Sequence, residues 1–97
     1  MKIVTVSARF TPENSSIAVN ILKAIKEEAC SMDNCLSYEF FVDPIEKGKL
    51  FIIQNWGTTA AFEAYRSSNL FSRMIKELKP LMIAVPETNI YKAERTV

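Results

Sequence analysis

The 97-residue sequence contains no histidine. This absence removes the Ser-His and Cys-His pairs of nucleophilic catalysis, and it removes the most common transition-metal ligand and proximal haem ligand. It also removes the usual general base near neutral pH. Any catalysis by this chain must therefore use carboxylates, tyrosine, lysine, cysteine or the chemistry of the substrate itself.

Cysteine is also scarce, with only Cys30 and Cys35 in the segment "CSMDNC". The spacing is not CxxC, and a zinc site normally needs four nitrogen or sulfur ligands. We expect a reduced pair, as is usual for cytoplasmic proteins, with Cys35 serving as a small buried hydrophobic residue. The sequence therefore predicts no metal, no haem and no other cofactor.

The chain has no excess of either charge, with 12 basic and 11 acidic residues and a net charge of +1. This balance does not supply the basic surface of a nucleic-acid-binding protein. No stretch approaches the roughly 20 apolar residues of a membrane span, and the N-terminal "MKIVTVSARF" lacks the apolar core of a secretory signal. We expect one cytoplasmic domain over residues 1–97, with neither nucleic acid nor membrane as a partner.

Apolar residues alternate in several stretches, as in half-buried strands. The pattern predicts strands over residues 2–10, 35–43 and 50–56, and a last strand from about 81 to 93. Pro86 inside the last strand indicates a bulge, an edge or a break. In the second strand, alternation places four residues on one face: Leu36, Tyr38, Phe40 and Val42.

Two segments show helical spacing of apolar residues. The first should begin after the N-cap Thr11, with Pro12 in its first turn, and should end near Cys30. The second follows Gly57, is interrupted or capped again by "SSN" at 67–69, and ends at Pro80.

The resulting order, β-α-β-β-α-β, is that of the α+β ferredoxin-like fold, in which both helices cover one face of an antiparallel sheet. The other face is left half-apolar, because Phe41 points away from Tyr38 and Phe40. A chain this short buries a modest fraction of its surface. We therefore expect a homodimer in which a second copy covers the helix-free face.

Residues 51–68, "FIIQNWGTTAAFEAYRSS", place the only tryptophan, Trp56, at a strand end and an aromatic pair, Phe62 and Tyr65, on the following helix. Two interpretations remain open, which are core packing and a ligand pocket lined by rings. We expect Trp56 and Tyr65 to border one cavity in the second case. Gln54 and Asn55 should face opposite sides of the sheet, and if buried they must be hydrogen-bonded, with each other across a dimer as one alternative.

The sequence resembles the antibiotic biosynthesis monooxygenase (ABM) superfamily of dimeric α+β barrel proteins. The likeness rests on the element order, on "CLSYEFFVDP", and on "FIIQNWGTTAAFEAYRSSNLF". It implies a ferredoxin-like subunit that dimerises through its sheet and holds a pocket between helices and sheet. Many members have Glu at the place of Gln54 and His at the place of Tyr65. The haem-degrading branch has Asn, Trp and His at the places of Ser7, Tyr65 and Ile75, so the resemblance does not extend to that activity.

The resemblance implies a cofactor-independent monooxygenase acting on a small aromatic or quinol-like substrate. Rings can hold the substrate ring, and an amide or guanidinium can hydrogen-bond an oxyanion. The alternative is a non-catalytic dimeric protein of the same fold that binds a small apolar molecule. The candidate catalytic residues are Tyr65, Trp56 and Asn55, and the candidate substrate-binding residues are Ser7, Phe62, Arg66 and Phe71.

Overall fold

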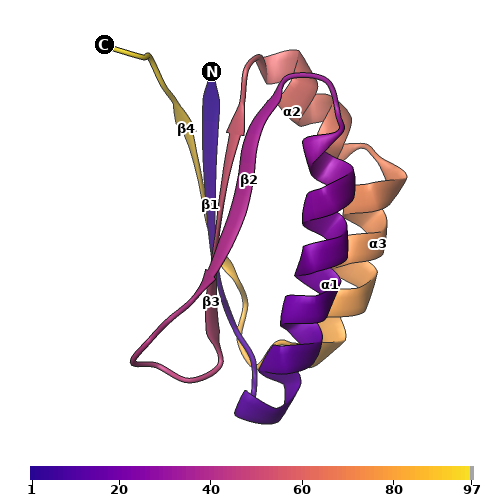
Figure 1. The fold of residues 1–97 in the computed structure, drawn as a ribbon, viewed down its shortest axis with the longest axis vertical. Helices are drawn as coiled ribbons and strands as arrows, with labels where there is room; N and C mark the ends of the chain where they lie inside the picture. The colour runs from indigo at the N-terminus through magenta and orange to yellow at the C-terminus, as the bar shows by residue number, and fades with distance from the viewer. Residues whose placement is uncertain (97) are drawn as a thin grey trace.

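The computed structural model describes residues 1–96, in which helices cover one face of a four-stranded antiparallel sheet (Figure 1). Residue 97, which the expected domain includes, lies outside the described part. The strand order is β2-β3-β1-β4, which confirms the predicted ferredoxin-like arrangement. The strands are β1 (Lys2–Arg9), β2 (Cys35–Val42), β3 (Lys49–Trp56) and β4 (Glu87–Lys92).

The helices begin at the caps that the sequence indicates. The Thr11 side chain accepts a hydrogen bond from the Asn14 amide at the start of the first helix. Between the second and third helices, the Ser68 side chain caps the third by accepting from the Phe71 amide, so the predicted interruption at 67–69 is confirmed. The helices are α1 (Pro12–Cys30), α2 (Thr59–Arg66), α3 (Asn69–Leu78) and a 3-10 turn, η1 (Lys79–Leu81).

The last strand is shorter than expected, because residues 79–81 form η1 and β4 begins only at Glu87. Pro86 directly precedes β4, and its missing N–H cannot join the hydrogen-bond ladder. Residues 82–86 therefore cross from the helix layer to the sheet, with a single bridge between Met82 and Phe10.

The second strand also departs from simple alternation. Cys35 pairs with Trp56 and Ser37 with Asn55, so Leu36 is the extra residue of a β-bulge. Leu36 is 59% exposed and lies beside Ser37 and Asn55 on the helix-free face. The expectation that Leu36 shares a face with Tyr38 is therefore wrong, because the bulge resets the side-chain alternation.

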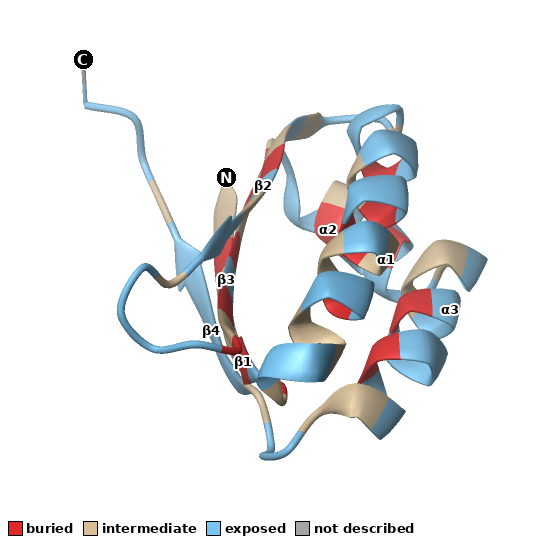
Figure 2. Ribbon diagram, turned by 60° about the horizontal axis from the view of Figure 1, so that its bottom comes forward, coloured by how far each residue is buried: buried red, intermediate tan, exposed pale blue. Residues whose placement is uncertain are grey.

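The hydrophobic core lies between the helices and the sheet. Figure 2 shows buried positions along β1 and β3 and on the helix sides that face them, whereas β4 is exposed throughout. The helix-facing residues of β3 are Leu50, Ile52, Gln54 and Trp56, all of them buried. Within residues 1–96, no helix is long and apolar enough to cross a membrane.

Candidate functional site

A cavity of about 200 Å³ lies between the sheet and the helices. Apolar side chains form most of its lining; Val6 and Ala8 of β1 contribute to the sheet side, and Met74 of α3 contributes to the helix side. Three aromatic residues of the second and third helices also line it: Phe62, Tyr65 and Phe71. A concave, largely apolar space with few polar groups is typical of small-molecule sites.

The cavity opens between β4 and the helices α2 and α3. This position follows from the lining residues that are also exposed, which are Thr88 and Ile90 on one side and Arg66 and Ile75 on the other. Arg66 forms an ion pair of 2.7 Å with Glu63, and its guanidinium carbon lies 4.9 Å from the centre of the Phe62 ring. A cationic group thus stands at the entrance.

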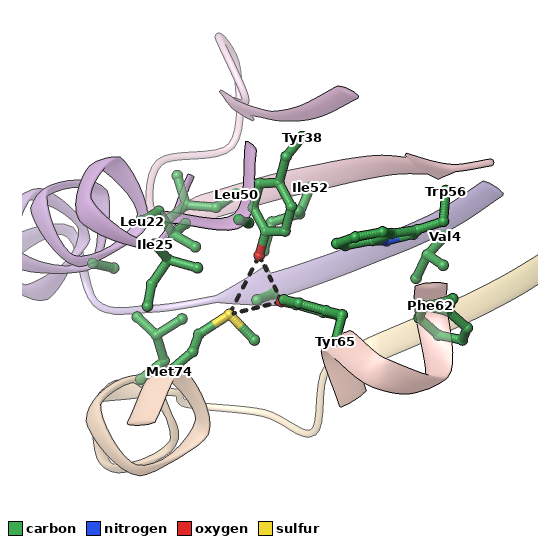
Figure 3. Packing of buried hydrophobic residues seen from close by; sticks show 14 of the residues in the cluster. Val4, Leu22, Ile25, Tyr38, Leu50, Ile52, Trp56, Phe62, Tyr65 and Met74 are labelled. Carbon is green, nitrogen blue, oxygen red and sulfur yellow. Dashed lines mark hydrogen bonds between the residues drawn. The ribbon is translucent and has the colours of Figure 1, made fainter. Parts of the chain in front are cut away.

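Tyr65 connects the cavity to the buried core. Its ring stacks on Trp56 with 4.9 Å between ring centres, and it meets Phe71 edge-on at 5.4 Å. Its hydroxyl lies 2.9 Å from the Tyr38 hydroxyl, and both hydroxyls reach the Met74 sulfur (Figure 3). The Tyr65 hydroxyl is therefore already engaged within the core.

The two hydroxyls stay protonated near neutral pH. Burial raises the pKa of Tyr65 to about 12, and burial also raises the pKa of Tyr38 well above its usual value. A neutral phenol can donate a hydrogen bond but cannot act as an efficient base at pH 7. Tyr65 therefore serves as a wall of the cavity, with its hydroxyl held by Tyr38, rather than as a proton acceptor.

We expect Tyr65→Phe to destabilise the fold by about 1–3 kcal/mol, because it leaves the buried Tyr38 hydroxyl with only a sulfur as acceptor. Tyr38→Phe should cost a similar amount. The double variant Tyr38→Phe/Tyr65→Phe should cost less than the sum of the two, since no hydroxyl is then left unpaired. Urea denaturation of the wild-type protein, the two single variants and the double variant measures this coupling. Losses in the free energy of unfolding that add strictly would refute it.

Trp56 lies behind Tyr65 and does not line the cavity. It is fully buried, and its indole Nε1 donates a 3.0 Å hydrogen bond to Gln54 Oε1. Trp56 can therefore act on a bound molecule only through Tyr65 and Gln54, which it holds in place.

Asn55 and Ser7 lie on the opposite, helix-free face of the sheet. Asn55 Nδ2 donates to Ser37 Oγ at 2.8 Å, while Asn55 Oδ1 is buried without a hydrogen-bond partner within residues 1–96. Ser7 pairs with Phe51, which also faces this side. Neither side chain can touch a molecule in the cavity, because successive residues of a strand point to opposite faces. The structure thus brings Tyr65, Phe62, Arg66 and Phe71 together at the cavity and separates Asn55 and Ser7 from it.

Gln54 and Thr88 are polar lining residues that the candidate set omits, and Gln54 is the buried one of the two. Only 3% of its surface is exposed, and its side chain borders the cavity. The sequence places Gln54 on the same side of the strand as Trp56, and the burial of Trp56 is needed to show that this side faces the helices.

Among the described residues, the lining of the cavity contains no carboxylate, thiol or imidazole. Across the part of the chain that the structure describes, no three potential metal ligands from His, Cys, Asp or Glu come together. Gln54, Arg66 and Thr88 are the lining residues that can hydrogen-bond a ligand or an ionised substrate, because the Tyr65 hydroxyl is held by Tyr38 and Met74.

The sequence pattern of the family described as Antibiotic biosynthesis monooxygenase matches residues 1–77. The chain belongs to this family. The match includes β1, α1, β2, β3 and α2, and nearly all of α3, so it covers most of the elements that surround the cavity. No curated protein matches the sequence.

Solved structures with the same fold are numerous. A candidate antibiotic biosynthesis monooxygenase from Deinococcus radiodurans superposes with a TM-score of 0.93 at 20% identity, covering 100% of this chain and 96% of that chain. A candidate antibiotic biosynthesis monooxygenase from Caulobacter crescentus superposes with a TM-score of 0.90 at 14% identity, covering 97% of this chain and 90% of that chain. Rv0793 from Mycobacterium tuberculosis superposes with a TM-score of 0.88 at 16% identity, covering 98% of this chain and 96% of that chain. At these identities the likeness establishes the shared fold.

Proposed function

We propose that this ABM-family chain is a cofactor-independent monooxygenase that acts on a small aromatic or quinol-like substrate bound in the cavity. The observation that carries the proposal is an apolar cavity bordered by the rings of Phe62, Tyr65 and Phe71. Aromatic side chains pack well against a planar ring, with about 0.5–1.5 kcal/mol per ring pair beyond area burial. An apolar enclosure also keeps water away from a reactive intermediate.

The described residues that line the cavity supply no general base, so the substrate must supply its own anion. Tyr65 and Tyr38 are held neutral, and no carboxylate of residues 1–96 reaches the cavity, so the substrate has to bind as a phenolate or ionise with water as the acceptor. Arg66 at the entrance favours the anion. The chain then holds the ring, excludes water and donates hydrogen bonds to the oxyanion.

The reaction itself balances without a cofactor. The bound anion transfers one electron to dioxygen, and the resulting superoxide joins the ring radical at a ring carbon. The peroxide anion then takes up from water the proton that the phenol released, which gives a hydroperoxide. Loss of water from the hydroperoxide leaves a carbonyl group. One oxygen atom of dioxygen enters the product and the other leaves as water, so dioxygen supplies the whole four-electron oxidation.

A non-catalytic small-molecule-binding protein is the second candidate. The engaged Tyr65 hydroxyl favours it, because Tyr38 and Met74 already surround that group. Such a protein would bind the same planar ligands without consuming oxygen.

Incubation with 1-naphthol under ¹⁸O-labelled dioxygen distinguishes the two functions. We expect 1,4-naphthoquinone carrying one labelled oxygen atom, formed faster than in the protein-free solution, with labelled water as the other product. Saturable binding of 1-naphthol without oxygen uptake above background would instead support the non-catalytic function.

We also propose that the working unit is a homodimer formed through the helix-free face of the sheet. Phe41, Phe51 and Tyr91 are large apolar side chains exposed on this face. Exposed apolar patches of this kind mark interaction surfaces, and a two-fold interface lets one patch cover its own copy.

Phe51→Asp should convert the dimer to a monomer, because it places a charge beside Phe41 on the apolar face without touching the core. The control is Ile45→Asp, since Ile45 is 91% exposed in the loop between β2 and β3 and should leave the dimer intact. Light scattering at micromolar concentration measures the mass of each protein. A monomeric wild-type chain, or a dimeric Phe51→Asp variant, would refute this interface.

A further inference from the structure

We infer that Gln54 is the recognition residue of the cavity and that its Nε2 donates a hydrogen bond to an acceptor oxygen, either a quinone carbonyl or a phenolate, on an otherwise apolar planar ligand. This inference rests on the proposed ligand site and names the chemistry that the site selects. The inference depends on three observations. They are the orientation of the Gln54 amide, the unused N–H donors of its nitrogen, and the lack of a competing donor nearby.

The orientation of the Gln54 amide follows from its neighbour. The indole Nε1 of Trp56 lies 3.0 Å from Gln54 Oε1. An indole N–H can only donate, so the amide atom that it meets must be the carbonyl oxygen. The amide nitrogen is therefore directed away from Trp56, and rotating the amide would set two donors against each other.

Gln54 Nε2 has no hydrogen-bond partner within residues 1–96, but protein atoms do not fully enclose it. Within residues 1–96, the only hydrogen bond of the Gln54 side chain is the one that Oε1 accepts. Asn55 Oδ1 is the single side-chain polar atom of the described residues that is fully enclosed without a partner. Gln54 Nε2 therefore retains open space beside it, and the open space next to Gln54 is the cavity. A buried amide left without an acceptor is costly, so a bound acceptor oxygen is favoured there.

Other polar groups of the lining do not compete for this role. Arg66 and Thr88 stand at the exposed entrance, and the Tyr65 hydroxyl is held by Tyr38 and Met74. The Trp56 N–H uses one of the two lone pairs of Gln54 Oε1, whereas both N–H donors of Gln54 Nε2 are unused. The site therefore favours ligands with a carbonyl or anionic oxygen over hydrocarbons of the same shape.

The test compares two ligands of matched shape, 1,4-naphthoquinone and 1,4-dimethylnaphthalene, by equilibrium dialysis against the wild-type protein and two Gln54 variants. We expect the wild-type protein to bind the quinone on the order of tenfold more tightly, which corresponds to one hydrogen bond. Gln54→Glu, assayed at a pH at which its carboxyl is ionised, keeps an acceptor for Trp56 but has no donor, and Gln54→Met removes the amide. In both variants the dissociation constant of 1,4-dimethylnaphthalene divided by that of 1,4-naphthoquinone should fall to about one or below.

Gln54→Glu decides the test if Gln54→Met does not fold, because Gln54→Glu preserves the hydrogen bond to Trp56. A ratio near one in the wild-type protein, or an unchanged preference for the quinone in a folded variant, would overturn the inference while leaving the ligand site in place. Failure of both ligands to bind the wild-type protein would overturn the inference together with the proposed function.

Discussion

Trp56→Ala should lower the free energy of unfolding by about 3–5 kcal/mol, the usual cost of truncating a large buried aromatic side chain. The Trp56 ring has an exposed fraction of 0% and stacks on Tyr65. Its removal also leaves the buried Gln54 Oε1 without its donor. Urea or thermal denaturation followed by circular dichroism measures the loss.

Trp56→Phe is the matched control, because it keeps a stacking ring and removes the indole N–H. We expect Trp56→Phe to lower the free energy of unfolding clearly less than Trp56→Ala does. The expected loss is on the order of 1–3 kcal/mol, because the amide oxygen of Gln54 is left unpaired and the side-chain volume is reduced. A Trp56→Ala variant as stable as the wild-type protein would contradict the buried position of this residue.

Val6→Phe should weaken binding of 1,4-naphthoquinone by on the order of 100-fold, equivalent to about 2.7 kcal/mol. Val6 points from β1 into the cavity, so a phenyl group at this position occupies the space that the ligand ring requires. The stability of the fold should change by no more than about 1 kcal/mol, because the added atoms enter an existing cavity rather than a packed core.

Val42→Phe provides the same substitution at an exposed position at the end of β2, on the sheet edge opposite the cavity entrance. It should leave quinone binding unchanged. Undiminished binding by a folded Val6→Phe variant would place the ligand elsewhere on the molecule.

Local signals were sufficient to predict most of the fold. The caps Thr11 and Ser68 act on backbone groups within three residues of themselves, and strand alternation needs only neighbouring positions. Pro86 indicated a local interruption, and β4 begins directly after it. The bulge at Leu36 was not predictable in this way, because it depends on which residue of β3 supplies the pairing partner, and a single sequence does not display this register.

The candidate site was predictable only in part, for a similar reason. The sequence places Phe62 and Tyr65 about one helical turn apart, and the structure buries both residues. The amides Gln54 and Asn55 are adjacent, so the sequence shows that they face opposite sides but not which one faces the helices. That assignment needs the burial of Trp56 and the pairing of Gln54 with Val4. The cavity itself is the volume left between distant elements, and no local pattern encodes it.

The central claim is that the cavity between α2, α3 and the sheet is the ligand site. A crystal structure of the wild-type chain with 1,4-naphthoquinone tests it most directly. We expect the quinone ring among Phe62, Tyr65 and Phe71, with one carbonyl oxygen within about 3 Å of Gln54 Nε2. A quinone bound on the helix-free face beside Asn55, with the cavity still empty at saturating ligand, would contradict the claim.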